Sequence, residues 1–208
     1  GTDVLETTAY DFANGEMYVR YTEPVRGADA FVMQAHTEPI NKWIMEQLIM
    51  VDAMKRASAR SITVVAPFLG YSRQDKKHQG REPITARLMF DLFRSAGADR
   101  IMTMDLHADQ IQGFFNVPVD HLYASGVILP YIQSLKLKDL AIATPDVGGS
   151  KRANTYAKYL GCPLVLCNKT RARATVVESI QIIGDVKDKN VVIIDDMVDT
   201  AGTITKAA

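Results

Sequence analysis

Little in this 208-residue sequence indicates a disulfide scaffold, a membrane protein or a polyanion-binding surface. It has two cysteines, Cys162 and Cys167, without metal-site or disulfide spacing, so buried apolar thiols in a reducing compartment are expected. No apolar run approaches the length of a membrane span, and the N-terminus has no signal-peptide pattern. The formal net charge is zero, so we expect neither nucleic acid nor membrane as a partner. These absences predict a soluble, cytoplasmic protein.

Two kinds of pattern are also missing. There are no heptads, short repeats or low-complexity tracts, which excludes coiled coils and repeat arrays. The phosphate-binding pattern G-x-x-x-x-G-K-[ST] does not occur, so any bound nucleotide must be held in another way.

What the sequence does contain is an alternation of apolar runs with segments of helical period. The expected strands are Met17–Tyr21, Ala30–Ala35, Ile62–Phe68, Arg100–Leu106, Leu140–Thr144, Pro163–Cys167, Ser179–Val186 and Val191–Asp195. The expected helices are Asn41–Ser58, Thr85–Ala96, Ala124–Leu135 and Gly149–Leu160. This order predicts an α/β protein with mainly parallel sheets, helices on both faces and binding loops at the carboxyl ends of the strands.

The alternation divides near Tyr123, which predicts lobes at residues 1–123 and 124–208. The first lobe opens on a short extended stretch, Thr7–Phe12, and the last helix runs only a few residues before Ala208. Both ends therefore look cut, and we expect the second lobe to be incomplete.

The segment Val191–Ile204 is the most informative. Four β-branched residues predict a fully buried strand, and Asp195, Asp196 and Asp199 follow it closely. Thr200, Gly202 and Thr203 then stand where a helix begins, where backbone N–H groups and hydroxyls suit a phosphate. The alternative is a buried strand with a charged turn and a helix cap. Clustered carboxylates repel one another without a cation or donors, so we favour a phosphorylated sugar, with Mg²⁺ as an option.

Other loops after expected strands carry weaker signals. Tyr71–Arg81 is rich in Arg and Lys and suits a polyphosphate, although a solvated basic loop is equally consistent. His107 follows a strand beside carboxylates, and Asp146 precedes paired glycines at a helix start. Residues 169–175 are basic and form either a surface loop or a lid that brings cations to phosphoryl groups.

Together these motifs resemble one family. In order along the chain they are Phe12-Ala13-Asn14-Gly15-Glu16, Arg73-Gln74-Asp75-Lys76-Lys77, Asp105-Leu106-His107-Ala108 with Gln110–Phe115, Pro145–Gly149, Lys169-Thr170-Arg171 and Asp195–Thr203. This set resembles bacterial class I ribose-phosphate pyrophosphokinases, the synthetases of phosphoribosyl pyrophosphate (PRPP). The resemblance runs from about Phe12 to Ala208 and implies two tandem type I phosphoribosyltransferase-like, Rossmann-like lobes.

The resemblance also implies an activity and the residues that perform it. The family transfers the β,γ-pyrophosphoryl group of ATP to the anomeric hydroxyl of ribose 5-phosphate, with Mg²⁺, in assemblies from dimers to hexamers. Lys169, Arg171 and His107 are implied to be catalytic, and His107 and Asp146 to meet the metal. ATP is implied to contact Arg73, Gln74, Asp75 and Lys76, and its adenine to contact Phe12, Asn14 and Glu16 of a neighbouring subunit. Ribose 5-phosphate is implied to bind at Asp195, Asp196, Asp199, Thr200, Ala201, Gly202 and Thr203.

Two other interpretations stay open at this point. A phosphoribosyltransferase that consumes PRPP needs the Asp195–Thr203 loop, but has no use for the Arg73–Lys77 cluster or the basic 169–175 loop. A non-catalytic homologue or a truncated ligand-binding fragment is the second alternative. The intact catalytic positions disfavour the homologue, whereas the ends that look cut keep the fragment open.

Overall fold

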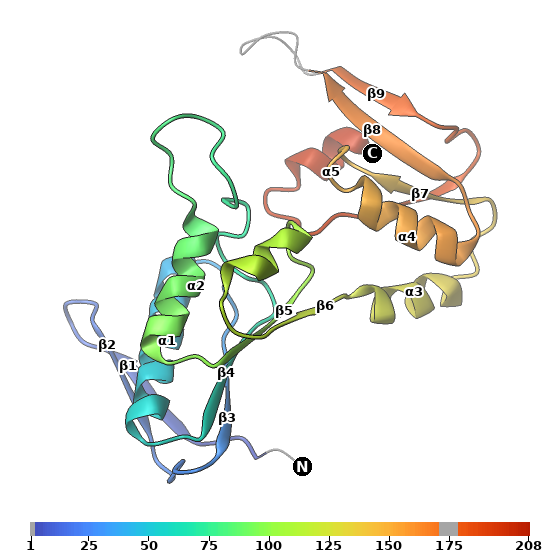
Figure 1. The fold of residues 1–208 in the computed structure, drawn as a ribbon. Coiled ribbons are helices and arrows are strands. Elements are labelled where there is room, and N and C mark those ends of the chain that lie inside the picture. The colour runs from blue at the N-terminus through green and yellow to red at the C-terminus, as the bar shows by residue number, and fades with distance from the viewer. Residues whose placement is uncertain (1–2, 171–178) are drawn as a thin grey trace. The chain divides into compact units, whose positions relative to one another are not determined.

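The computed structural model describes residues 3–170 and 179–208. The chain divides into two compact units, Gly1–Tyr123 and Ala124–Ala208, and each is described by itself (Figure 1). Among the described helices, none has the length and apolar character that crossing a membrane requires.

The first unit is built on a parallel sheet. Its strands are β3 (Asp29–Met33), β4 (Ser61–Ala66), β5 (Arg100–Met104) and β6 (Val119–Leu122), and they lie side by side in that order. Helix α1 (Ile40–Arg56) connects β3 to β4, and α2 (Thr85–Ala96) connects β4 to β5. A 3₁₀ helix, η1 (Asp109–Phe114), lies between β5 and β6. A separate antiparallel hairpin, β1 (Thr7–Asp11) and β2 (Met17–Tyr21), precedes the sheet and packs on α1.

Helices α1 and α2 pack against each other on one face of this sheet. Strands added in a single direction by right-handed crossovers place their helices on the same side. Under these helices, Val32, Val64 and Ile101 lie in register on three neighbouring strands and are almost fully buried. Phe31 and Met33 point to the opposite face and are more than half exposed. The expectation of helices on both faces is therefore wrong for the described part of this unit.

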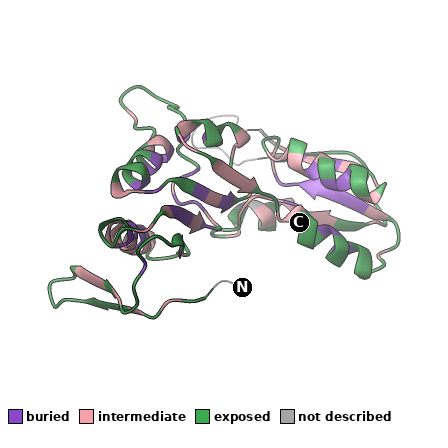
Figure 2. Ribbon diagram, turned by 60° about the horizontal axis from the view of Figure 1, so that its bottom comes forward, coloured by how far each residue is buried: buried purple, intermediate pink, exposed green. Residues whose placement is uncertain are grey.

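The second unit has the strand order β10-β7-β8-β9. Strands β7 (Leu140–Thr144), β8 (Leu164–Thr170) and β10 (Asn190–Ile193) are parallel, and β9 (Ser179–Ile183) is antiparallel to β8. Helices α3 (Ser125–Ser134) and α4 (Ser150–Leu160) pack on each other, and a short helix, α5 (Gly202–Ala207), follows β10. Figure 2 shows the buried residues along the strands and the inner faces of the helices. The predicted α/β class with mainly parallel sheets is confirmed.

Two details of the sequence prediction are wrong. The strand Val191–Asp195 was expected to be fully buried, but β10 is an edge strand that pairs with β7 alone among the described strands. Val191 is accordingly 38% exposed, and burial is reached only at Ile194. Cys162 is half-buried rather than buried, whereas Cys167 lies in the interior as expected.

Candidate functional site

Three carboxylates of the second unit come from two neighbouring strands. Asp146 follows β7, and Asp195 and Asp196 follow β10. The two strands are parallel with Ile193 opposite Ala143, so the residues that leave them emerge at the same edge of the sheet. The backbone N–H of Ile194 donates to the Ala143 carbonyl at 2.8 Å and extends this register to the point where the loops begin.

Asp195 has an unusual carboxyl group. Its pKa is raised to about 6, first because the side chain is partly buried and then because of its interaction with Asp196 and the negative charge of Asp146. The Asp196 N–H donates to Asp195 Oδ1 at 2.9 Å, which opposes part of the shift. Arg152, in the first turn of α4, lies 3.8 Å from Asp196 Oδ1. Concentrated negative charge of this kind is a receptive environment for a cation or for hydroxyl donors.

The loop that carries Asp146 is closed by its own side chain. Gly149 N–H donates to Asp146 Oδ1 at 3.0 Å, and the Thr144 hydroxyl donates to the Asp146 carbonyl oxygen at 2.9 Å. Gly149 lies so close to Thr144 that a Cβ there would meet the Thr144 hydroxyl oxygen. Thr144 is fully buried, so it has little freedom to move away. Of the paired glycines, Gly149 is therefore the one that allows its backbone to lie close to Thr144.

The loop after Asp196 runs into α5. Asp199 and Thr200 are exposed, and Ala201 has a left-handed backbone with φ of 58° just before the helix begins at Gly202. The Thr205 N–H donates to the Ala201 carbonyl at 2.9 Å and closes the first turn. Thr203 belongs to this turn of backbone, but its side chain lies outside the described atoms.

In the first unit, the basic segment predicted to bind ATP leaves β4 and leads to α2. The side chains of Arg73, Gln74 and Lys76 are exposed, whereas Asp75 is largely buried. Gln74 connects the segment to α2, because its carbonyl oxygen accepts from Ala86 N–H at 3.2 Å and its amide oxygen accepts from the Thr85 hydroxyl. Glu82 accepts from the N–H groups of His78 and Gln79, at 2.7 and 3.0 Å, and fixes the far end of the basic loop.

His107 is exposed in the loop between β5 and η1. That loop is held from β6, where His121 Nε2 accepts from Leu106 N–H at 3.0 Å and the Leu122 carbonyl accepts from Asp105 N–H at 2.9 Å. Asp105 itself has a positive φ of 46°. Sequence analysis missed His121 because it missed β6, whose four residues include two polar ones and give no clear apolar run.

The tip of the β1–β2 hairpin carries the residues expected to meet adenine. Phe12 is 46% exposed, and its ring packs edge-on to Tyr10, which stacks on Tyr18 with centroids 4.9 Å apart. Gly15 N–H donates to the Phe12 carbonyl at 2.8 Å, and Glu16 N–H donates to Asn14 Oδ1 at 3.1 Å. The tip is therefore an ordered turn with an exposed aromatic face, a surface on which a base stacks readily.

The residues expected to be catalytic lie partly outside the described part of the chain. Lys169 belongs to the backbone of β8, but its side chain is not described, and Arg171 falls in the undescribed segment 171–178. His107 and Asp146 belong to different units, which are described separately. The structure therefore tests neither the catalytic roles of Lys169, Arg171 and His107 nor the metal-binding roles of His107 and Asp146.

The described residues do not form a ready-made cage of three or more His, Cys, Asp or Glu ligands for a metal. Mg²⁺ is usually held by one or two carboxylates together with substrate phosphates and water. The hard oxygens of Asp146 and of the partly buried Asp195 fit that donor set.

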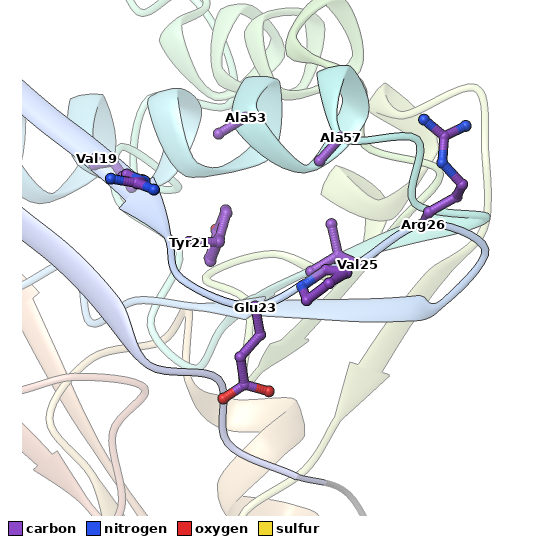
Figure 3. Close-up of a pocket in the computed structure, with 9 residues that line it drawn as sticks. Val19, Tyr21, Glu23, Val25, Arg26, Ala53 and Ala57 are labelled. Atoms are coloured by element: carbon purple, nitrogen blue, oxygen red, sulfur yellow. The ribbon is translucent and has the colours of Figure 1, made fainter.

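A hollow of about 400 Å³ lies elsewhere, between β2 and the last turns of α1 (Figure 3). Its lining consists of Val19, Arg20, Tyr21, Glu23, Pro24, Val25, Arg26, Ala53 and Ala57. It adjoins the segment that enters β3, whereas the loops described above leave the carboxyl ends of strands. None of its lining residues belongs to those loops, so we place the candidate site at the strand ends.

The fold and these loops define the class: an α/β protein with mainly parallel sheets, whose candidate ligand-binding loops follow the carboxyl ends of the strands. Family models agree with this. Residues 1–97 match the N-terminal domain of ribose phosphate pyrophosphokinase, and residues 126–208 match a phosphoribosyl transferase domain.

Individual relatives are similar throughout the chain. A ribose-phosphate pyrophosphokinase of Bifidobacterium longum is 61% identical, with 100% of this chain and 63% of the relative covered. One from Wolinella succinogenes is 50% identical, with 100% and 67% covered. The crystal structure of phosphoribosylpyrophosphate synthetase from Mycobacterium smegmatis matches with a TM-score of 0.92 and 52% identity, over 99% of this chain and 67% of that one. The chain belongs to the ribose-phosphate pyrophosphokinase family, and it spans about two thirds of the length of these relatives.

Proposed function

We propose that this chain carries the catalytic centre of a ribose-phosphate diphosphokinase (EC 2.7.6.1), which converts ATP and ribose 5-phosphate to PRPP and AMP. The main observation that supports this proposal is that this family member has two loops together. One is the basic loop after β4, and the other is the loop after β10, which carries carboxylates and hydroxyls. Each loop leaves the carboxyl end of a parallel strand, which is where α/β proteins with open sheets bind their ligands.

In this proposal, the first unit holds ATP. The exposed Arg73 and Lys76 bind phosphate oxygens, Arg as a fork and Lys as a point charge. Gln74 adds an amide and also secures the segment to α2, and Asp75, whose side chain is largely buried, completes the set of residues that we assign to ATP. The aromatic hairpin tip stacks on the adenine of a neighbouring subunit's ATP, with Phe12, Asn14 and Glu16 as its contacts. The enzyme therefore works as a self-associated assembly, a dimer or a larger one up to a hexamer.

The second unit holds ribose 5-phosphate. Asp195, Asp196 and Asp199 bind the sugar hydroxyls, and the turn Thr200–Thr203 binds the 5-phosphate through backbone N–H groups and hydroxyls. For Mg²⁺ we propose Asp146 in the second unit and, separately, His107 in the first unit. When bound, Mg²⁺ supplies Lewis-acid neutralisation of phosphate charge.

The reaction needs positioning more than proton transfer. The anomeric hydroxyl oxygen attacks the β-phosphorus of ATP, the bond from that phosphorus to the α,β-bridging oxygen breaks, AMP leaves, and the hydroxyl proton passes to water. Transfer of this kind depends on holding two anions in line and neutralising the developing charge, which is the role we give to Lys169 and Arg171. The described residues include no side chain that must act as a general base.

The competing interpretation is a ligand-binding fragment without turnover. It shares the ligand-binding loops of the leading proposal and differs from it in the absence of turnover. A PRPP-consuming phosphoribosyltransferase is disfavoured, because it has no use for the basic loop after β4.

The deciding experiment is ³¹P NMR of the purified chain with ATP, Mg²⁺ and ribose 5-phosphate. New PRPP and AMP signals establish the diphosphokinase. Unchanged ATP from a folded chain that still binds ribose 5-phosphate identifies the fragment. PRPP consumption with an added base, and no PRPP formation, identifies the transferase.

Replacement of Lys169 tests the transition-state role. We expect K169A to lower turnover by about 100-fold or more while ATP affinity changes by less than about threefold, because its contact forms mainly in the transition state. The matched control is K158A, an exposed lysine in the last turn of α4, which should leave both quantities unchanged. Equal losses of turnover and ATP affinity in K169A would contradict the role.

A further inference from the structure

A buried chain of hydrogen bonds crosses the first unit beside the segment we assign to ATP. His36 is 2% exposed, and its Nδ1 accepts from the Gly70 N–H at 3.0 Å. Its Nε2 lies 2.8 Å from Gln47 Oε1, and Gln47 Nε2 donates to the carbonyl oxygens of Val32 at 2.8 Å and Val65 at 3.1 Å. Gln47 is fully buried on the inner face of α1.

Backbone groups at both ends determine where the protons lie. The carbonyl oxygens of Val32 and Val65 only accept, so the Gln47 amide nitrogen must face them and its oxygen must face His36. The Gly70 N–H only donates, so His36 Nδ1 carries no proton. His36 is therefore the neutral Nε2–H tautomer and donates to Gln47 Oε1.

The chain of hydrogen bonds ends at Gly70, where the segment that we assign to ATP begins. Gly70 packs so closely on α1 that a Cβ would lie 2.8 Å from Ile40 Cδ1 and 3.0 Å from Ile44 Cδ1. The next residue, Tyr71, is held at a φ of 65°, and its hydroxyl donates to Asn41 Oδ1. Arg73 follows two residues later. Among these contacts at the start of the segment, the bond to His36 is a buried hydrogen bond.

Protonation of His36 would destroy this bond. An imidazolium carries N–H groups at both nitrogens, so Nδ1 would present a donor to the Gly70 donor. Burial lowers the pKa of His36, and the hydrogen bond with Gln47 opposes part of that effect. The groups against the ring are Gln47 from α1 and, from α2, the parallel ring of Phe93 at 6.1 Å. No described charged side chain contributes to the shift; the adjacent Glu46 accepts from Gln34 instead.

We propose that His36 is a positioning residue for the ATP-binding segment, and that it holds Gly70 only while it is neutral. The proposal rests on the assignment of Arg73–Lys76 to ATP. In this role, His36 and Gln47 support the ATP-binding segment in a way that depends on the protonation of His36, and neither side chain is assigned to ligand binding.

Two isosteric variants separate the two ring nitrogens. In H36N the amide oxygen replaces Nδ1 as the acceptor for Gly70, and in H36Q the longer amide reaches Gln47 but leaves Gly70 without its acceptor. Kd values for ATP and for ribose 5-phosphate are measured by calorimetry from pH 7.5 to 5.5. Exchange of the Gly70 amide is followed by NMR, corrected for intrinsic rates. Because the terminal phosphate of ATP itself titrates near about pH 6, H36N is the reference at every pH.

We expect H36Q to weaken ATP binding about three- to tenfold at pH 7.5, the effect of one lost hydrogen bond, and H36N to stay within about twofold of the wild type. Because burial lowers the pKa of His36, the further drop of ATP affinity and Gly70 protection in the wild type relative to H36N should appear at the acid end of the series. Ribose 5-phosphate binding should be the same in all three proteins.

Equal Gly70 exchange in all three proteins at every pH would overturn the positioning role. Equal losses in H36N and H36Q would also overturn it, because they would show a packing effect alone. If H36Q does not fold, the pH series of the wild type against H36N decides the question. Absence of ATP binding in the wild type would refute the ATP assignment instead, and the Gly70 exchange would still test His36.

Discussion

At the scale of single residues, the site depends on positions where almost nothing can be added. Gly149 is one of them, because an added methyl group would meet the hydroxyl oxygen of the buried Thr144. Thr144 is held in turn by its bond to the Asp146 carbonyl, so relief requires movement of the loop that carries Asp146. A backbone position, rather than a catalytic side chain, therefore controls where this carboxylate lies.

Substitution of Gly149 tests that control. We expect G149A to destabilise the second unit by about 1–3 kcal/mol, as overpacking of a tight interior does, and to weaken ribose 5-phosphate binding in the presence of Mg²⁺. The double variant T144A/G149A should lose less stability than the sum of the two single variants, because Thr144 is the obstacle. Urea unfolding and calorimetric titration measure both effects.

The control for this experiment is G126A, in α3. A Cβ at Gly126 meets nothing within 4 Å, so this change should be neutral or stabilise the unit by up to about 1 kcal/mol. A G149A chain as stable as G126A would show that the close approach has no energetic importance.

At the scale of helices and strands, the sequence predicted the elements that have a clear hydrophobic period. It missed an element and buried residues that only tertiary packing identifies. The helix Thr85–Ala96 and the strand Leu140–Thr144 have the predicted bounds, because their apolar residues follow the periods of 3.6 and 2 or form a continuous run. Strand β6 was missed because its partners lie on β5, which no local pattern in Val119–Leu122 reveals. The buried Gln47 and His36 were missed for the same reason, since only their tertiary contacts distinguish them from surface residues.

Helix α3 offers a test at this scale. Pro130 lies inside the helix and is exposed, and it lacks the N–H that would bond to the carbonyl of Gly126. We expect P130A to stabilise the second unit by about 1–2 kcal/mol, which is the gain in helix propensity less the lower unfolded-state entropy that Pro provides. Urea unfolding followed by circular dichroism measures it.

Val127, 76% exposed on the same helix, provides the comparison, because V127A keeps its backbone N–H and should change stability by less than about 0.5 kcal/mol. A P130A chain that is less stable than the wild type would mean that α3 depends on the proline for its geometry.

At the scale of the whole molecule, the two units should respond to pH in opposite directions. In the first unit the pKa of His36 is lowered on folding, so below about pH 6.5 the unfolded chain binds a proton that the folded one does not, and stability falls as pH falls. In the second unit the pKa of Asp195 is raised to about 6, so between about pH 4 and 6 the folded chain binds the extra proton, and stability rises as pH falls.

Hydrogen exchange resolved by peptide, without ligands and corrected for intrinsic rates, measures these slopes separately in residues 1–123 and 124–208. H36N should flatten the slope of the first unit and leave the second unchanged, and D195N should do the reverse. Parallel slopes in both units, unaffected by either variant, would show that neither group governs the pH dependence of stability.

The buried chain from Gly70 to the carbonyls of Val32 and Val65 also limits how sequences in this family can diverge. Loss of His36 alone leaves a buried glutamine oxygen without its donor, and loss of Gln47 alone leaves a buried imidazole N–H without its acceptor. Either intermediate is costly, whereas an apolar pair of similar volume in place of both side chains is tolerable. Natural relatives should therefore carry the histidine and the glutamine together or lack them together, and the pair should behave in evolution as one inherited character.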